Sequence, residues 1–383
     1  MSQKPRILVH CQFVYGIGHF VRTIELCKSL KSSFQITLVS GGETVPNFQI
    51  PQEIDFIQLP AIYKEDGKEG LKVVDSESDL ESIMVYRKFL LTDLVEKCNP
   101  DIFVSEHFPF GLLFEDEVLT TIGKIKSHNP NCKLVCSVRD IILTHGGAKS
   151  DLRTCEILNS FYDLVLIHGD PNFIQLRNTF PFEHLIKTKI KYTGYVVERL
   201  VDLSRSSSKS KIVVSVAAGR IGSELITFVQ NAIPEITNQI DIDLFFFTGA
   251  FQKDIITKNP EKDFINVLPF HRTEYINQIQ ECDLLICLAG YNSIIEALSI
   301  SKKLLVYRKE FSEGNDEQQI RIRMFESHDL LQSITFDEIS KGLLAQKILD
   351  RIRNRNIVQS QIDTNGANRT AYFLQNLFSD SQN

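Results

Sequence analysis

Short apolar runs alternate with stretches of helical period along most of the chain. The first run, Arg6–Cys11, is followed by a turn with two glycines and then by Phe20, Ile24 and Cys27 on one helical face. Strand-length runs separated by helical segments are typical of a parallel sheet with crossover helices. The same pattern predicts further strands at 35–40, 54–59, 101–105, 133–137, 164–168, 189–193, 212–216, 244–248, 264–268, 284–288 and 303–307.

Two polar stretches interrupt this alternation. Residues 201–210, VDLSRSSSKS, are rich in serine and predict a linker, and residues 63–81 carry many charges without a steady period and predict a surface loop. A chain of 383 residues is also too long for one ordinary core. We therefore expect two α/β domains, at 1–200 and 211–360, joined by the linker at 201–210.

The composition narrows the class of protein. With 43% hydrophobic and 23% charged residues the chain reads as globular, and a net charge of −6 disfavours a nucleic-acid partner. The N-terminus lacks the pattern of a signal peptide, and no apolar run has the length of a membrane span. The eight cysteines form no Cys-x-x-Cys pair and lie partly in apolar runs, as in proteins of a reducing compartment. These features predict a cytoplasmic protein.

A glycine-rich turn follows the first predicted strand. Gly16 and Gly18 allow the backbone to approach a ligand, and the helix that follows directs free N–H groups at it. His19 could accept a proton from a substrate hydroxyl, or it could merely cap the helix. The full Gly-x-Gly-x-x-Gly pattern is absent, which argues against a nicotinamide enzyme.

A second candidate segment runs from Leu288 to Leu298, at the end of a predicted strand. Ser293 and Glu296 have the spacing of a capping box, which is one interpretation. In the other, Asn292, Ser293 and the free N–H groups bind a diphosphate, and Glu296 accepts hydrogen bonds from a ribose. Both interpretations use the same Glu296 side chain, and the local pattern does not choose between them.

Other polar segments also lie at predicted strand ends. Glu317 and Gln318 supply acceptors and donors that suit sugar hydroxyls, or they belong to an ordinary polar loop. Glu106 and His107 could act as base or bind an acceptor, and a buried or capping role is an equal alternative. For Arg139 beside Asp140 we expect a structural ion pair.

Two further segments have simpler interpretations. Asp241 and Asp243 directly precede a predicted strand and so lie at its amino end, away from the edge where ligands bind. We therefore assign them to solvent and expect no metal site. The apolar run 108–114 suits core packing, with contact to a lipid acceptor or a membrane surface as the alternative.

Taken together, three motifs resemble those of GT-B glycosyltransferases. They are Gly-x-Gly-His at 16–19, Gly-Tyr-Asn-Ser-x-x-Glu-Ala at 290–297 and Glu-Gln-x-x-Arg at 317–321. The similarity is greatest to the branch with MurG-type N-acetylglucosaminyltransferases and UDP-glycosyltransferases. Segments 105–111, 137–140, 168–171 and 192–195 also resemble a bacterial group known mainly as predicted glycosyltransferases. The resemblance implies two Rossmann-like α/β domains facing each other across a cleft, with a helix in 361–383 returning to the first domain.

The resemblance also implies roles for particular residues. His19 matches the position of the base, and Glu106 and His107 remain the alternative base or acceptor contacts. The implied donor contacts are Gly18, Gly219, Arg220, Gly290, Asn292 and Ser293 for the diphosphate, Glu296 for the ribose, the backbone around Phe270 and His271 for the nucleotide base, and Glu317 and Gln318 for the sugar. No metal and no cofactor is implied. The sequence departs from plant-type relatives at Tyr291, where they have tryptophan, and at Leu288, where they often carry part of a His-Cys pair.

The leading hypothesis is therefore a metal-independent glycosyltransferase. It would move a sugar from a nucleotide-sugar donor, expected to be UDP-linked, to a small-molecule or lipid-linked hydroxyl, with peripheral membrane contact as an open option. One alternative is a nucleotide-sugar 2-epimerase, which the same architecture supports. The other is a non-catalytic subunit that binds nucleotide sugars.

Overall fold

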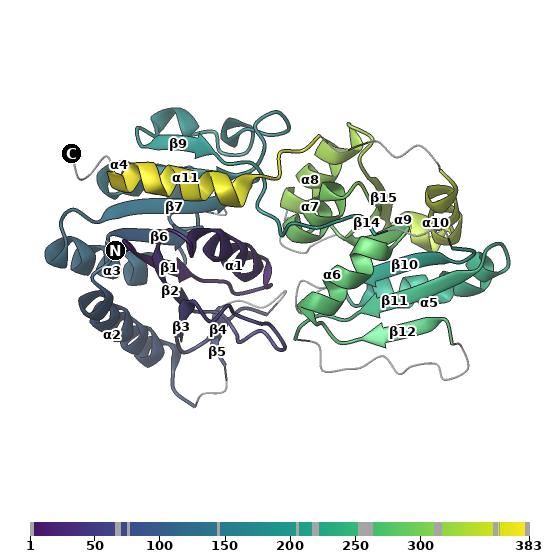
Figure 1. The fold of residues 1–383 in the computed structure, drawn as a ribbon, viewed down its shortest axis with the longest axis horizontal. Coiled ribbons are helices and arrows are strands. Elements are labelled where there is room, and N and C mark those ends of the chain that lie inside the picture. Colours follow the sequence, from purple (N-terminus) through teal and green to yellow (C-terminus); the bar gives the residue numbers. More distant parts are fainter. Residues whose placement is uncertain are drawn as a thin grey trace.

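The chain folds around two parallel sheets that lie side by side (Figure 1). The computed structural model describes residues 4–65, 70–74, 77–143, 146–203, 207–216, 222–251, 263–309, 316–354, 359 and 361–379. The first sheet has seven strands in the order β3-β2-β1-β6-β7-β8-β9, and the second has six in the order β12-β11-β10-β13-β14-β15. We call the two sheets with their helices the first and the second unit.

The first sheet reverses its strand order in the middle. Its strands are β1 (Arg6–Cys11), β2 (Gln35–Ser40), β3 (Ile54–Gln58), β6 (Ile102–Glu106), β7 (Lys133–Arg139), β8 (Leu164–His168) and β9 (Lys189–Tyr192). The chain builds outward from β1 to β3 and then crosses over to β6, which pairs with the other side of β1. Such a reversal opens a crevice outside the carboxyl ends of the two central strands, and ligands of parallel sheets bind there.

The second sheet repeats this topology. Its strands are β10 (Ser210–Ser215), β11 (Ile242–Phe247), β12 (Ile265–Leu268), β13 (Leu284–Leu288), β14 (Lys303–Arg308) and β15 (Gln332–Thr335). The reversal falls between β10 and β13, which pair in parallel. The turn after β13 is therefore at the position expected of a ligand site.

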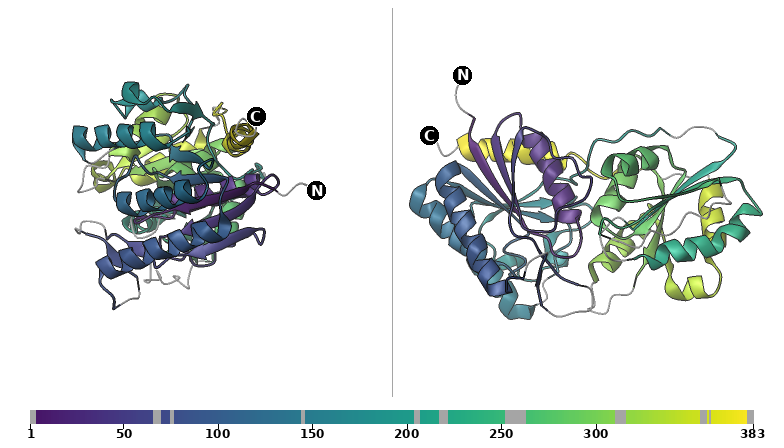
Figure 2. Two further views of the ribbon diagram at one scale, coloured as in Figure 1. Left: turned by 90° about the vertical axis from the view of Figure 1, so that its left-hand side faces the viewer. Right: turned by 90° about the horizontal axis from the view of Figure 1, so that it is seen from below.

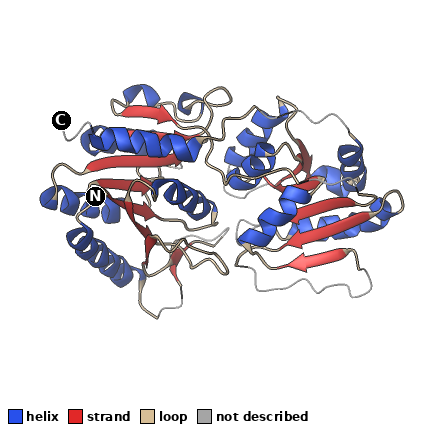
Figure 3. Cartoon of the chain, in the orientation of Figure 1, coloured by secondary structure: helices blue, strands red, loops and turns tan. Residues whose placement is uncertain are grey.

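Helices cover both faces of each sheet (Figures 2 and 3). In the first unit they are α1 (Gly18–Leu30), α2 (Leu80–Cys98), α3 (Glu115–His128) and α4 (Gly147–Phe161), with short 3-10 turns at Leu176–Asn178 and Glu183–Leu185. In the second they are α5 (Glu224–Thr237), α6 (Arg272–Glu281), α7 (Tyr291–Ser299), α8 (Asp316–Glu326), α9 (Phe336–Ser340) and α10 (Leu344–Arg353). Strands such as β8 and β13 are buried along their whole length, because both faces of a parallel sheet are covered.

The last helix, α11 (Gly366–Ser379), lies on the first unit beside α1 (Figures 1 and 2). Its approach runs alongside the first connection between the units, where the Tyr195 N–H donates to Asp363 O at 2.6 Å and the Gly366 N–H donates to Tyr195 O at 3.0 Å. A Cβ at Gly366 would lie 2.4 Å from Gly194 O, so only glycine fits this crossing. The two connections between the units are thus hydrogen-bonded to each other.

The observed elements differ from the sequence-based prediction in two main places, and β10 and β11 also each begin two residues before the predicted strands. The predicted loop at 63–81 contains part of a small antiparallel pair, β4 (Ile62–Tyr63) with β5 (Lys72–Val73), and the start of α2. Strand β15 was not predicted, because its four residues include one fully buried apolar side chain, Ile334, and show no clear alternation.

Several simpler predictions can be compared with the structure. Phe108, Phe110 and Phe114 of the apolar run are buried, as core packing requires, although Leu113 is 56% exposed. All eight cysteines are free thiols, and all but Cys98 are buried. Among the described residues, no helix combines the length and hydrophobicity that crossing a membrane requires.

Candidate active site at the boundary between the two sheets

His19 and Glu106 meet at the reversal point of the first sheet. His19 lies in the first turn of α1, just after β1, and Glu106 is the last residue of β6. His19 Nδ1 and Glu106 Oε1 are 3.0 Å apart and hydrogen-bonded. The His19 side chain is 18% exposed and the Glu106 side chain 1% exposed, so of this pair only the histidine can meet a ligand.

Glu106 is held from its other side by a chain of buried polar groups. The Arg22 guanidinium forms an ion pair with it, and Ser137 Oγ donates to Glu106 Oε2 at 2.8 Å. Because the single Ser137 proton is used in this way, His168 Nε2 must donate to Ser137 Oγ across 2.9 Å. Thr193 Oγ1 lies 2.9 Å from His168 Nδ1 and completes the chain. The position of the Glu106 carboxylate is therefore fixed by direct neighbours on α1 and β7, and His168 of β8 holds Ser137 in turn.

The electrostatics of this pair suit a neutral histidine beside a carboxylate. Burial alone would raise the pKa of Glu106, but the Arg22 guanidinium and the hydrogen bond from His19 hold that pKa far below its usual value. Burial lowers the pKa of His19, and Arg139 and Arg22 act in the same direction, against the opposing effect of Glu106. A carboxylate can only accept, so the His19 proton lies on Nδ1 and Nε2 carries the basic lone pair.

A second imidazole lies next to His19. The His107 ring centroid is 5.3 Å from that of His19, and the residue has a positive φ of 68° directly after β6. Burial, together with His19 and Arg139, lowers the pKa of His107 to about 3, so the ring is neutral. Its buried Nδ1 has no hydrogen-bond partner in the described residues. His107 is thus placed to contact a substrate beside the candidate base.

The N-terminus of α7 faces this group from the second unit. The N-cap is Gly290 and no side chain caps the helix, so of the two interpretations left open for Ser293 and Glu296 the capping box does not form. The reason is register, because the helix begins at Tyr291 and places Ser293 inside the first turn. The first N–H groups of α7 therefore have no partner within the helix. Asn292 Nδ2 donates to Gly18 O at 3.1 Å and so brings this turn against the start of α1.

Tyr291, the first residue of α7, is buried between the two units. Its hydroxyl donates to His168 O at 2.9 Å and accepts from the Val196 N–H at 2.9 Å. The Arg22 guanidinium lies 5.2 Å from the centre of its ring. The residue that stands in place of tryptophan is therefore buried and connects the two units.

Glu296 pairs with a neighbouring helix instead of capping its own. Glu296 Oε1 lies 2.7 Å from Arg272 Nη1, and the buried Oε2 has no hydrogen-bond partner in the described residues. Burial raises the pKa of Glu296, with Arg272 opposing the shift. Oε2 therefore has unused acceptor capacity, although the Glu296 side chain is only 3% exposed.

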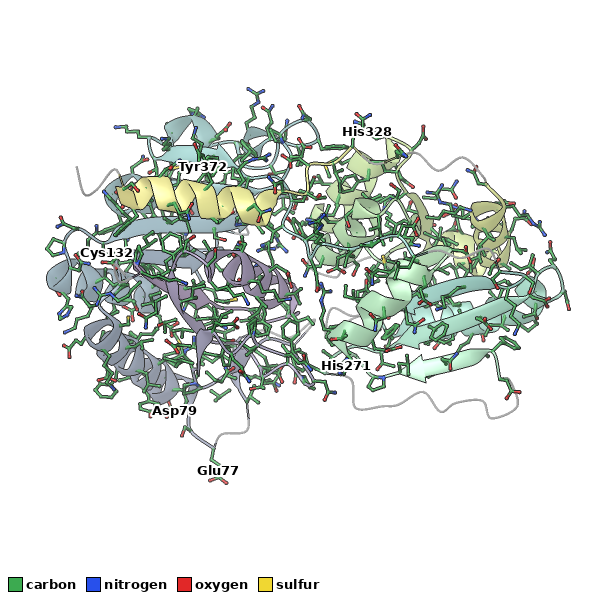
Figure 4. All side chains as sticks on the ribbon, in the orientation of Figure 1. Glu77, Asp79, Cys132, His271, His328 and Tyr372 are labelled. Atoms are coloured by element: carbon green, nitrogen blue, oxygen red, sulfur yellow. The ribbon has the colours of Figure 1, made fainter. Side chains whose placement is uncertain are left out.

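The predicted contacts to the nucleotide base lie at the start of α6. The Phe270 side chain is buried in the same apolar cluster as Ile17 and Phe20, so its ring is not available for stacking on a base. His271 is the N-cap of α6, where its Nδ1 accepts from the Glu274 N–H at 3.4 Å, and Figure 4 shows it at the edge of the second unit nearest the first. Only the backbone of this segment remains for the expected contact.

Glu317 and Gln318 lie in the first turn of α8. Glu317 forms ion pairs with Arg321 at 2.8 Å and with Arg139 of the first unit at 2.5 Å. Asp140 pairs with Arg321 at 2.8 Å. The predicted pair between Arg139 and Asp140 is therefore wrong, because each has its partner in the second unit. The buried Gln318 Oε1 has no hydrogen-bond partner in the described residues.

Some predicted residues are not part of this group. Gly219 and Arg220 lie outside the residues that the structure describes. Asp241 and Asp243 are at the amino end of β11, where Lys209 lies 3.5 Å from Asp243. Within the described ranges no three His, Cys, Asp or Glu side chains are arranged to hold a metal ion.

Sequence reasoning assigned no role to Arg22, Ser137, His168, Thr193 or Arg321. Ser137 and His168 are polar residues at or near the carboxyl ends of otherwise apolar strands. That placement is a usable signal, because such positions line the ligand edge of a parallel sheet. Arg22 and Arg321 gave no such signal, since each lies within a helix whose charged residues would ordinarily face solvent.

Comparison with known proteins identifies the architecture. No protein-family model matches the sequence, and no curated protein matches it. Among solved structures, MurG of Acinetobacter baumannii is 12% identical, with a TM-score of 0.56 and coverage of 97% of this chain and 99% of that one. A UDP-glucosyltransferase from Polygonum tinctorium is 12% identical, with a TM-score of 0.60 and 99% of each chain covered. A UDP-N-acetylglucosamine 2-epimerase is 13% identical, with a TM-score of 0.61 and coverage of 100% of this chain and 98% of that one. The chain has the GT-B fold that the motifs predicted.

Proposed function

We propose that this protein is a glycosyltransferase that uses a nucleotide-sugar donor and takes His19 as its base. The observation that carries the proposal is the hydrogen bond between His19 Nδ1 and the buried Glu106 carboxylate. It leaves a basic Nε2 at the boundary between the units, opposite the uncapped N-terminus of α7. A neutral base and a site for a leaving diphosphate thus face each other, as sugar transfer requires.

The reaction needs one proton transfer and one displacement. His19 Nε2 takes the proton of the acceptor hydroxyl as its oxygen bonds to the anomeric carbon. The bond from that carbon to the diphosphate breaks, and the electron pair leaves with the nucleotide diphosphate. The resulting imidazolium is stabilised by Glu106, which stays ionised because Arg22 and Ser137 hold it.

The second unit would hold the donor. Gly290, Asn292 and Ser293 surround the free N–H groups of α7, which attract the diphosphate without a metal ion. Glu296 Oε2 would accept from a ribose hydroxyl, and Glu317 and Gln318 would contact the sugar. We infer UDP as the nucleotide and a small-molecule or lipid-linked alcohol as the acceptor. The buried free thiols suit a cytoplasmic location.

The substitution His19→Ala tests the base. Removing a positioned base is expected to lower kcat by about 10²–10⁴-fold while the donor Kd changes little. His184→Ala is the matched control, because His184 is an exposed histidine of the same unit. A His19→Ala protein that turns over at the wild-type rate would remove His19 from the mechanism.

A 2-epimerase is the second candidate function, because the structure of such an enzyme is as similar to this chain as those of the transferases are. The two activities differ in their need for an acceptor. Incubation with UDP-N-acetylglucosamine alone is expected to leave the sugar unchanged in configuration. Formation of the 2-epimer without any acceptor would overturn the transferase proposal, and tight binding without turnover on any acceptor would favour a binding subunit.

A further inference from the structure

Four charged residues form one continuous chain across the boundary between the units. Arg139 ends β7 of the first unit and Asp140 follows it, while Glu317 and Arg321 are one turn apart on α8 of the second. Arg139 Nη2 lies 2.5 Å from Glu317 Oε2, Glu317 Oε1 lies 2.8 Å from Arg321 Nη2, and the same Nη2 lies 2.8 Å from Asp140 Oδ1. We call this set the charge chain.

Two of the three ion pairs in the charge chain form only when the two units are in contact. Asp140, Glu317 and Arg321 are buried, and the two residues from each unit find oppositely charged partners in the other unit. Within the second unit, Glu317 and Arg321 also pair with each other. A buried charge without its partner is strongly unfavourable, so this contact favours the closed arrangement.

The charge chain also fixes a residue of the proposed donor site. Each oxygen of the Glu317 carboxylate is held by a different guanidinium, one from each unit. Arg321 Nη1 further donates to Ala289 O at 3.0 Å, directly before the turn at Gly290. The orientation of the Glu317 carboxylate and the turn that would hold the diphosphate are therefore tied to the same arginine.

We propose that Arg139 is a positioning residue that completes the donor-sugar subsite from the opposite unit. It holds Glu317 in the orientation that contacts the sugar, and it does so only in the closed arrangement. Recognition of the sugar is thereby coupled to closure, whereas binding of the nucleotide alone is not. This inference rests on the proposed function, in which Glu317 contacts the sugar.

The contacts around the charge chain support this coupling. Asn292 reaches Gly18 O, and the Tyr291 hydroxyl reaches His168 O, so the donor turn is bonded to the first unit at two further points. Neither contact involves Glu317. Loss of Arg139 is therefore expected to affect the sugar more than the diphosphate.

The test compares Arg139→Gln and Arg139→Lys with wild type. Calorimetry measures the Kd of UDP and of UDP-glucose or UDP-N-acetylglucosamine, whichever binds wild type more tightly. Because the buried Glu317 carboxylate loses one of its two charged partners, Arg139→Gln is expected to weaken binding of the UDP-sugar about tenfold or more and that of UDP less than about twofold. Arg139→Lys, which keeps the positive charge but loses the planar guanidinium, is expected to recover part of the difference.

A second measurement reports closure directly. Small-angle X-ray scattering of the protein without ligand is expected to give a larger radius of gyration for Arg139→Gln than for wild type. Arg153→Gln is the matched control, because Arg153 pairs with Glu115 and Glu156 on the exposed surface of the first unit. Neither the radius nor the Kd ratio should change in this control.

The outcomes separate this inference from the proposed function. If wild type prefers UDP-sugar to UDP and Arg139→Gln keeps the same Kd ratio, the inference is overturned and the proposed function stands. If wild type binds no UDP-sugar, the proposed function fails. In that case an unchanged radius of gyration in Arg139→Gln overturns the closing role of the charge chain as well, and a larger radius supports it.

Discussion

His19 is a partly exposed histidine whose chemistry depends on one buried neighbour. Glu106 accepts the proton of His19 Nδ1 and thereby selects the tautomer with a basic Nε2. Arg22 and Ser137 hold Glu106 in turn, so the carboxylate cannot rotate away. Glu106, which the sequence alone left as an alternative base, thus lies behind His19 and orients its ring.

The same environment predicts how activity depends on pH. Because burial lowers the pKa of His19 from the ordinary histidine value of 6.5, most His19 side chains are still neutral at pH 6.5. The acidic limb of kcat/KM is therefore expected to have its midpoint below pH 6.5, with activity lost as His19 is protonated. A pH–rate profile with saturating donor checks this, and a midpoint above pH 6.5 would contradict it.

His168 predicts a pH effect on stability. Burial and Arg22 lower its pKa to about 3 in the folded state, while the unfolded chain takes up a proton near pH 6.5. The unfolded state binds more protons between these values, so this contribution to stability is present above pH 6.5 and declines as the pH falls. Between pH 7 and pH 5 the loss from this one residue is about 2 kcal/mol.

Urea denaturation of wild type and His168→Gln at both pH values isolates this effect. Glutamine cannot be protonated in this range. From about pH 7 to pH 5 the free energy of unfolding of His168→Gln should therefore fall by about 2 kcal/mol less than that of wild type. The comparison cancels other titrating groups, including Glu296, whose raised pKa acts in the opposite direction. Equal slopes for the two proteins would show that His168 is not held neutral.

At the scale of elements, α11 shows how a terminal segment supports a site it does not touch. It lies against α1, which carries His19 and Arg22, and Ser29 Oγ of α1 donates to Ala367 O at 2.9 Å. Leu374 points into the apolar cluster of the first sheet, whereas Tyr372 lies on the outer face (Figure 4). The last helix of the chain thus helps to hold the helix that carries the candidate base.

Truncation of Leu374 tests this packing. Leu374 is 1% exposed, and Leu374→Ala is expected to lower the free energy of unfolding by about 2–5 kcal/mol through lost burial and a residual cavity. Tyr372, on the same helix, is 59% exposed, and Tyr372→Ala should change the free energy of unfolding by no more than about 0.5 kcal/mol. Urea denaturation of both variants measures the two changes. Equal losses of unfolding free energy would mean that α11 is not packed as described.

At the scale of the whole molecule, the two units meet through polar contacts close to the proposed ligands. A donor that binds only the folded protein should raise its stability. At 100 times its Kd the gain is about 2.7 kcal/mol, which thermal unfolding detects as a higher Tm. UDP-linked sugars are expected to raise the Tm more than the same sugars without a nucleotide. If no nucleotide sugar changed the Tm at millimolar concentration, the donor assignment would fail.

The sequence by itself determined most of the parallel strands of the fold, although not β15. The apolar runs predicted β1, β2, β8 and β13 with their observed bounds, because burial on both faces of a parallel sheet leaves a continuous local signal. The motifs likewise predicted the GT-B architecture, which comparison with solved structures shows. Such features depend on residues close together in the chain, so a linear pattern is enough to find them.

Only the tertiary structure decided which side chains meet. Asp140 and Arg321 are 181 positions apart, so neighbouring residues suggested an ion pair between Arg139 and Asp140 that does not form. Glu296 pairs with Arg272 of α6, because α7 begins at Tyr291 and Ser293 lies inside its first turn. Side-chain pairing is set by short-range contacts between strand ends and helices that come together only when both sheets are complete. Most of the parallel strands therefore follow from the sequence pattern, and the partners of the buried charges follow from the packing of the elements within and between the two units.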